Sequence, residues 1–250
     1  MRARVMLAGC AALISCTDVE TGPNVATSLE FRTLPFPAVV ALDTLRDTSG
    51  VAAPLRAVVF NSDNEEIAGA PVRYISLDTT VKVDSITGLV VGGLAPNTSA
   101  RVIASIGAIQ SAPVRLGVVS RPDSVARSGS IDTLRYSVTD TTKNLSGDLS
   151  VRVLHRTTTA PVSVPDWIVT FALLNPADST RARLVGEDGR RSTTDTTSAG
   201  GIAARRIRLS PGGLTSARDS IVVLARVRYR GMQIAGSPAR LVLPVQPLVP

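Results

Sequence analysis

Short runs in which apolar and polar residues alternate occur along most of this chain, and they limit what it can fold into. In the clearest run, Leu134, Tyr136 and Val138 alternate with polar side chains. A period of two places successive side chains on opposite faces of a β-strand. No segment keeps a 3.6-residue apolar period for three turns, as a surface helix would require. The pattern therefore predicts an all-β chain.

A change in composition divides these runs into two series. Residues 120–124 read Ser-Arg-Pro-Asp-Ser, a polar stretch with a proline that is typical of a linker. A chain of 250 residues has room for two domains. We expect β-sandwiches at 29–119 and 125–246 and a short tail at 247–250. The expected strands lie at 55–60, 72–74, 81–83, 89–91, 101–106, 134–139, 149–153, 167–171, 182–185, 202–209, 221–229 and 239–245.

The first residues have the features of an export signal. Arg2 and Arg4 precede an apolar stretch at residues 5–14, and small residues precede Cys16. Residues 13–16 (Leu-Ile-Ser-Cys) resemble the lipobox of bacterial lipoproteins, which implies cleavage before Cys16 and lipidation of that cysteine. An ordinary cleaved signal or a buried first strand would be the alternative. We expect a lipoprotein signal peptide at 1–15.

The residues around Cys16 also bear on location and on disulfides. Residues 16–28 are expected to form a polar tether between the membrane and the first domain. Attached acyl chains would anchor the exported chain stably to the bacterial envelope. The outer membrane is the expected destination because Thr17, and not aspartate, follows the cysteine. The other cysteine, Cys10, belongs to the signal, so the mature chain has no structural disulfide.

The residue inventory offers little for catalysis. His155 is the single histidine, which excludes metal sites that need two, and we expect it at the end of a strand. The chain has no G-x-S-x-G elbow, no phosphate-binding G-x-x-x-x-G-K loop and no cysteine after Cys16. These features predict a protein that is not an enzyme and uses no cofactor.

One group of oxygen ligands is a weak candidate for calcium. Asn61, Asp63 and Glu65 lie close together in the sequence. The spacing fails as an EF-hand because Glu66 occupies the glycine position and Val72 the position of the bidentate glutamate. A solvated hairpin turn is the alternative, and we expect no metal.

Basic residues form a second candidate site. The chain contains 27 basic residues, of which only Lys82 and Lys143 are lysines, and its formal charge is +7. If the two strands involved belong to one sheet, its outer face would carry an arginine stripe that attracts anionic glycans, lipopolysaccharide or membrane headgroups. A solvated outer face is the alternative. Nucleic acid is not expected because aromatic residues make up only 3% of the chain. The stripe would consist of Arg206, Arg208, Arg226, Arg228 and Arg230.

Both units resemble known bacterial domains. Residues 68–74 and 83–90, which include Gly69-Ala70-Pro71-Val72 and a Gly-Leu-Val turn, resemble group 2 bacterial immunoglobulin-like domains. Residues 167–171 and 194–203 are similar to the invasin-type, group 1 relatives, with an elongated segment at 156–165 as a departure. The resemblance implies immunoglobulin-like sandwiches used at a bacterial surface as a spacer, adhesive or binding module, without catalytic residues.

These observations combine into one expectation. The chain is expected to be an exported, lipid-anchored and non-enzymatic protein with two tandem immunoglobulin-like β-sandwiches after a signal segment. It would act as an adhesive, scaffold or spacer in the cell envelope. The alternative is a module that binds a glycan or cell-wall polymer through its arginines. The membrane, an anionic glycan or another surface protein would be the partner, and the sequence leaves the oligomeric state open.

Overall fold

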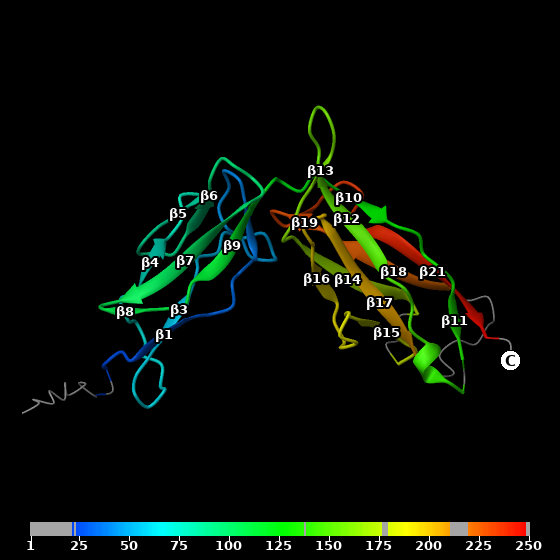
Figure 1. Cartoon of the computed structure of the whole chain (residues 1–250), viewed down its shortest axis with the longest axis horizontal. Coiled ribbons are helices and arrows are strands. Elements are labelled where there is room, and N and C mark those ends of the chain that lie inside the picture. The colour runs from blue at the N-terminus through cyan, green and yellow to red at the C-terminus, as the bar shows by residue number, and fades with distance from the viewer. Residues whose placement is uncertain (1–21, 23, 138, 177–179, 211–219, 249–250) are drawn as a thin grey trace, which may run out of the picture.

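The structure, a computed structural model, describes residues 22, 24–137, 139–176, 180–210 and 220–248. The predicted signal peptide and Cys16 lie outside these residues, as does most of the predicted tether. Figure 1 shows two β-sandwiches that follow one another along the long axis of the molecule. Apart from the single 3₁₀ turn η1 (Thr141–Lys143), the regular structure described is all strand. None of the described residues forms a helix with the length and apolarity needed to cross a membrane.

The first sandwich contains two layers. One sheet has the order β2-β9-β7-β4, with β8 paired to β7. The other layer consists of the pairs β1-β3 and β5-β6, and isolated bridges connect residues 41 and 44 to β6. The strands are β1 (Ser28–Phe31), β2 (Ala38–Val40), β3 (Ala57–Phe60), β4 (Arg73–Ser76), β5 (Val81–Val83), β6 (Val90–Gly92), β7 (Thr98–Ile106), β8 (Ile109–Gln110) and β9 (Val114–Val119).

The second sandwich begins at Ser124, after four connecting residues. One sheet has the order β10-β12-β17-β15, with β13 paired to β12, and the other has the order β11-β21-β18-β14-β16. The strands are β10 (Ser124–Ser128), β11 (Leu134–Tyr136), β12 (Leu149–His155), β13 (Val162–Ser163), β14 (Ile168–Asn175), β15 (Ala182–Val185), β16 (Thr194–Thr196), β17 (Ile202–Leu209), β18 (Ser220–Arg226) and β21 (Ala239–Pro247). A separate hairpin joins β19 (Arg228–Tyr229) to β20 (Met232–Gln233).

The two units share the connection that characterises immunoglobulin-like sandwiches. In the first unit, β1 pairs antiparallel with β3, and β2 then crosses over to pair parallel with β9. In the second unit, β10 pairs antiparallel with β12, and β11 pairs parallel with β21. The first segment of each unit therefore contributes to both layers. The expected fold class, all-β with tandem immunoglobulin-like sandwiches, is confirmed.

The alternation seen in the sequence explains how the strands form a core. On β12, Leu149, Val151 and Val153 are buried, while Ser150 and Arg152 between them are not. On β14, which lies in the opposite sheet, Val169 and Phe171 are buried in the same way. The apolar faces of the two sheets therefore meet and exclude water, which is the main favourable contribution to folding.

The structure corrects the expected strand at 221–229. This segment forms two strands, because β18 ends at Arg226 and β19 begins at Arg228. Val227 between them donates its backbone N–H to Ser237 Oγ, at 2.9 Å, instead of continuing the ladder. Arg230 and Gly231 both have positive φ, as the central residues of a tight hairpin turn often do. The β19–β20 hairpin therefore forms a two-stranded sheet of its own, separate from the sheet that contains β18.

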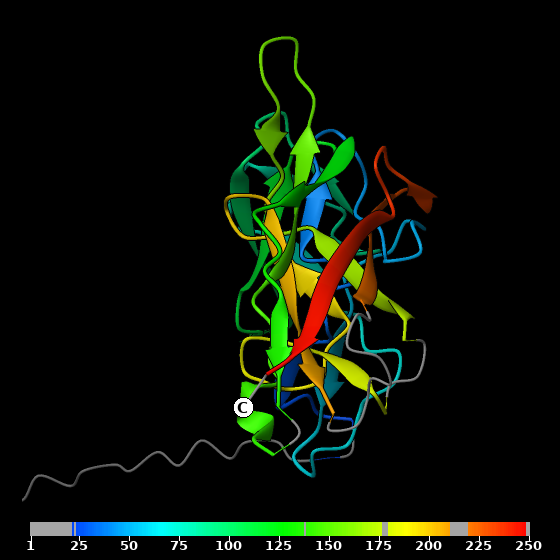
Figure 2. The same ribbon diagram turned by 90° about the vertical axis from the view of Figure 1, so that its right-hand side faces the viewer.

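The elongated segment at 156–165 forms the arm of a hairpin. β13 returns along β12, pairing Leu154 with Ser163 and His155 with Val162. The connecting residues 156–161 are exposed. Figure 2 shows this loop projecting beyond the rest of the molecule.

Candidate functional site at the contact between the two sandwiches

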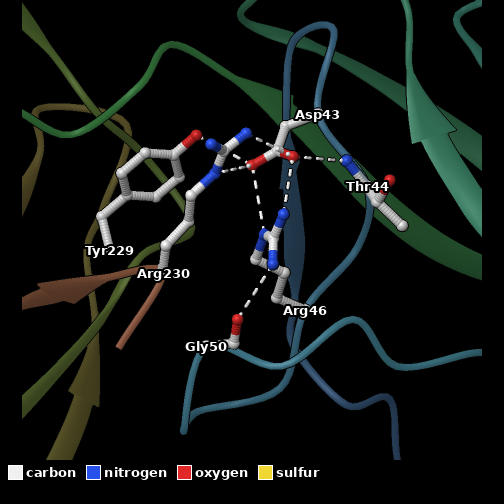
Figure 3. A network of polar contacts seen from close by, with 6 residues as sticks. All are labelled: Asp43, Thr44, Arg46, Gly50, Tyr229 and Arg230. Atoms are coloured by element: carbon white, nitrogen blue, oxygen red, sulfur yellow. Dashed lines mark hydrogen bonds and ion pairs between the residues drawn. The ribbon is translucent and has the colours of Figure 1, made fainter. Parts of the chain in front are cut away.

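A buried carboxylate from the first sandwich lies at the contact with the second. Asp43 is 7% exposed and lies in the loop after β2, which ends at Val40. Its Oδ2 accepts hydrogen bonds from the Tyr229 hydroxyl, at 2.8 Å, and from Arg230 Nε, at 3.1 Å. Arg230 Nη2 donates to the other oxygen, Oδ1, at 2.9 Å. Figure 3 shows the β19–β20 hairpin bringing both residues to Asp43. The second sandwich thus holds the carboxylate through a bidentate arginine and a tyrosine.

Residues of the first sandwich hold the same carboxylate from the other side. Arg46 donates from Nη2 to Asp43 Oδ1, at 3.1 Å, and from Nε to Oδ2, at 3.3 Å. The Thr44 backbone N–H donates to Oδ1 at 2.8 Å. Arg46 also donates to the carbonyl of Gly50, at 3.0 Å, and this bond fixes the loop that faces the second unit (Figure 3). Asp43 therefore accepts hydrogen bonds both from its own loop and from the neighbouring domain.

These contacts determine the charge state of Asp43. Burial alone would raise the pKa of its carboxyl group. The hydrogen bonds from Arg230, Arg46, Tyr229 and the Thr44 N–H outweigh burial and hold the pKa well below its ordinary value. The pKa of the Tyr229 hydroxyl is raised, first by burial and then by its bond to the Asp43 carboxylate. Both shifts stabilise an ionised Asp43 beside a neutral Tyr229.

Aromatic rings pack beside the polar contact. The ring of Phe36, from the first sandwich, lies 4.6 Å from that of Trp167, measured between centroids. Trp167 in turn lies 6.3 Å from Tyr229 and donates its Nε1–H to the carbonyl of Arg228, at 3.2 Å. Phe36 and Trp167 are both buried. Because aromatic pairs at these distances attract each other and bury large areas, the polar contact is backed by an apolar one.

Two glycines allow the backbones of the two units to touch. A Cβ on Gly50 would lie 2.0 Å from the backbone N of Gly231, and a Cβ on Gly231 would lie 2.8 Å from the carbonyl oxygen of Ser49. Elsewhere along the contact, a Cβ on Gly117 of β9 would lie 2.7 Å from Asp166 Oδ2. The two backbones therefore meet at positions where no side chain fits.

The structure separates the five arginines that the sequence grouped together. Arg206 and Arg208 lie on β17, whereas Arg226 lies on β18, in the opposite sheet. Arg228 belongs to the β19–β20 hairpin, and Arg230 binds Asp43 at the domain contact. The premise of one shared sheet is therefore wrong, because the immunoglobulin-like topology places β17 and β18 in different layers. Binding of an anionic polymer by these arginines stays a prediction.

The calcium candidates form a turn that is held by its own side chain. Asn61 Oδ1 accepts hydrogen bonds from the backbone N–H groups of Asp63, at 3.0 Å, and Glu65, at 2.8 Å. Glu65 Oε2 lies 3.4 Å from Asn61 Nδ2. The described residues contain no group of three or more His, Cys, Asp or Glu side chains placed to hold a metal ion.

His155 ends β12, at the position that the alternation predicted. Its Nδ1 lies 2.6 Å from Oδ2 of Asp123, in the segment that connects the two sandwiches. Arg121 Nε lies 2.8 Å from the other carboxylate oxygen of Asp123. Burial alone would raise the pKa of Asp123, but the bonds from Arg121 and the Arg156 N–H outweigh it and lower the pKa. This cluster fixes the end of the linker against β12.

The Asp43 contact joins residues that no sequence motif connects. Asp43 and Tyr229 are 186 residues apart, so no local pattern connects them. The one local signal was the pair Arg230-Gly231, which favours a tight turn and interrupts the alternation of the preceding strand.

No protein-family model matches this chain, and no curated protein matches it. Similar solved structures include the Yersinia pseudotuberculosis adhesin InvE, with a TM-score of 0.36 and 14% identity, over 87% of this chain and 58% of that one. Domains 4 and 5 of the S-layer protein SbsC give a TM-score of 0.32 and 12% identity, over 90% of this chain and 99% of that one. Human protocadherin-24 EC1-2 gives 0.27 and 15%, over 91% and 100%. Likeness at this level defines neither a family nor a function.

The close approach of the two backbones can be tested with a pair of matched substitutions. Gly50→Ala is expected to separate the two sandwiches, because the added Cβ meets the backbone of Gly231. Gly69→Ala is the control, since Gly69 also has positive φ but nothing lies within 4 Å of the site of its Cβ. Small-angle X-ray scattering should show a larger radius of gyration for Gly50→Ala only. Equal expansion of both variants would contradict the contact.

The Asp43 contact should also respond to pH. The lowered pKa of Asp43 gives stability that is present above the ordinary carboxyl pKa, about 3.9, and is lost as the pH falls below it. The raised pKa of Tyr229 gives stability that is present below about pH 10 and is lost above it. Scattering across pH should show a compact molecule from about pH 5 to 9 and expansion in acid. An equal acid expansion in Asp43→Asn, which cannot titrate at this position, would contradict the assignment.

Proposed function

We propose that this chain is a non-enzymatic module of the bacterial cell envelope that acts as an adhesive, a scaffold or a spacer. The observation that supports the proposal best is the contact centred on Asp43. A buried carboxylate with four donor groups, an aromatic pair and two touching glycines hold one sandwich against the other. Such a contact suits a protein whose work is to hold a fixed distance and present a fixed surface.

Two domains of one chain usually move relative to each other, so a spacer function requires a contact that holds them in one arrangement. A short linker alone leaves two domains free to bend unless their interface is large or apolar. Here the linker, between Val119 and Ser124, is reinforced by the Phe36–Trp167 pair and by the Asp43 network. A bend at the linker would break both, and it would leave the Asp43 carboxylate without two of its donor groups.

The non-enzymatic part of the proposal is supported by what the side chains do. Histidine is the residue that enzymes most often use as a general base at neutral pH. The single histidine of this chain, His155, is in contact with Asp123 at the linker. Catalysis by acid and base needs several such groups around a substrate cavity. The cysteine that remains after cleavage of the proposed signal would be Cys16, which we assign to the anchor.

We further propose that the chain is exported and held at the envelope, most simply the outer membrane, by acyl chains on Cys16. The features that support this are Arg2 and Arg4, the apolar stretch at 5–14 and the lipobox-like residues before Cys16. The residues between Cys16 and Ser28, where β1 begins, would then separate the first sandwich from the membrane surface.

The proposed spacing can be measured directly, because the chain contains no cysteine after Cys16. Lys82 on β5 and Arg183 on β15 are exposed, so Lys82→Cys and Arg183→Cys in a background with Cys10→Ser and Cys16→Ser would carry a pair of spin labels. We expect one narrow distance distribution, which broadens in Asp43→Ala because the carboxylate that joins the two units is gone. A broad distribution in the protein with Asp43 intact would contradict a rigid spacer.

The anchor has a separate test. In a bacterial host with a lipoprotein pathway, the full chain should fractionate with membranes, and mass spectrometry should find acyl chains on an amino-terminal Cys16. Cys16→Ser should be released from the membrane fraction, since each buried methylene of an acyl chain contributes about 0.8 kcal/mol. An unmodified Cys16 or cleavage elsewhere would overturn the anchor and leave the spacer proposal standing.

A further inference from the structure

A second feature of the domain contact is a cavity of about 170 Å³ beside the aromatic pair. It lies between the two sandwiches, because its wall contains residues of both. The lining residues are Phe36 and Thr48 of the first sandwich and Ile168, Thr170, Arg226 and Arg228 of the second. This lining carries two positive charges and no carboxylate.

The register of the second sandwich brings the two cations together. Thr170 on β14 pairs directly with Arg226 on β18. Thr170 alternates with the buried residues Val169 and Phe171, so it lies on the outer face of the sheet. Arg228 follows Arg226 after the fully buried Val227. Although the strand is interrupted at Val227, Arg226 and Arg228 both line the cavity, together with Phe36 and Thr48 of the first sandwich.

These two arginines lack the partners that other arginines nearby have. Arg230 pairs with Asp43, and Arg206, in the opposite sheet, pairs with Asp148 at 2.7 Å. Within the part of the chain that the structure describes, neither the Arg226 nor the Arg228 side chain has an ion pair or hydrogen bond. Two unpaired cations in one concave site create a positive potential that favours an anion.

We propose that this cavity binds the oxyanion group of an acidic sugar through Arg226 and Arg228. A guanidinium group presents paired N–H donors that match a carboxylate or a sulfate. The hydroxyls of Thr48 and Thr170 can exchange hydrogen bonds with sugar hydroxyls, and Ile168 supplies an apolar wall beside them. The site needs both sandwiches, because Phe36 and Thr48 close it from the other side.

Free inorganic sulfate offers an oxyanion without a sugar, so it must be compared with an acidic sugar. The proposal does not depend on the lipid anchor or on the spacer function. It also differs from a general attraction of the basic surface for anions, which would involve arginines of both sheets equally.

The test is a calorimetric titration of the purified protein at low salt with glucuronate, with sodium sulfate and with neutral glucose. Glucuronate should bind, and the affinity should fall about tenfold or more in Arg226→Gln and in Arg228→Gln, since each removes a charged hydrogen bond. Arg183→Gln, at an exposed arginine on β15 that does not line the cavity, is the matched control and should bind glucuronate as the unmodified protein does. The thermal unfolding of all three variants should be unchanged or nearly so, which separates lost binding from lost folding.

Several results would overturn the proposal. The first is that glucuronate does not bind at millimolar concentration, the second is that glucose binds as strongly, and the third is an equal loss of binding in Arg183→Gln. Sulfate that binds as tightly as glucuronate would overturn the assignment to a sugar. Gly50→Ala, which should separate the sandwiches, is expected to weaken binding, and undiminished binding there would overturn a site shared by both units. A narrow spin-label distance in a protein that binds no glucuronate would leave the spacer function intact.

Discussion

The Asp43 carboxylate is the constraint on which the arrangement of the two sandwiches depends. Removing a carboxylate from water is costly unless hydrogen bonds replace its hydration. Arg46 and the Thr44 N–H, from its own domain, supply part of that replacement, and Tyr229 and Arg230 supply the rest. The first sandwich is therefore electrostatically incomplete alone, and docking of the second completes it. Burial of Phe36 against Trp167 acts in the same direction.

The sequence predicted the strands better than their partners. Alternation located the core of β12 and β14, because burial on one face of a strand leaves a local trace in the order of residues. It also grouped Arg226 with Arg228, and both line the cavity between the sandwiches. It could not assign β17 and β18 to different sheets, because pairing depends on contacts between distant segments. Asp43 and Tyr229 left no trace at all, since no repeat or spacing connects them.

The preference for arginine over lysine has a structural explanation at several positions. Arg230 binds both oxygens of Asp43 while its guanidinium lies 5.4 Å from the centre of the Tyr229 ring. Arg205, on β17, is nearly buried and reaches Asp195 and Ser192 with different nitrogens. A lysine ammonium cannot make such forked contacts or lie flat on a ring. Part of the basic character of the chain therefore serves its own packing.

The parallel pairing of the second strand of each sandwich with its last strand has a mechanical consequence. In the first unit, β2 lies beside β9, with Ala38 opposite Gly117 and Val40 opposite Val119. A pull along the chain enters β2 at its start and leaves β9 at its end, which are opposite ends of the pair. The load therefore shears all the hydrogen bonds of that ladder together and does not peel them apart one by one. The pairing of β11 with β21 repeats this geometry in the second unit. A pulling force along the chain would therefore load both sandwiches in shear, the direction in which a strand pair resists separation most.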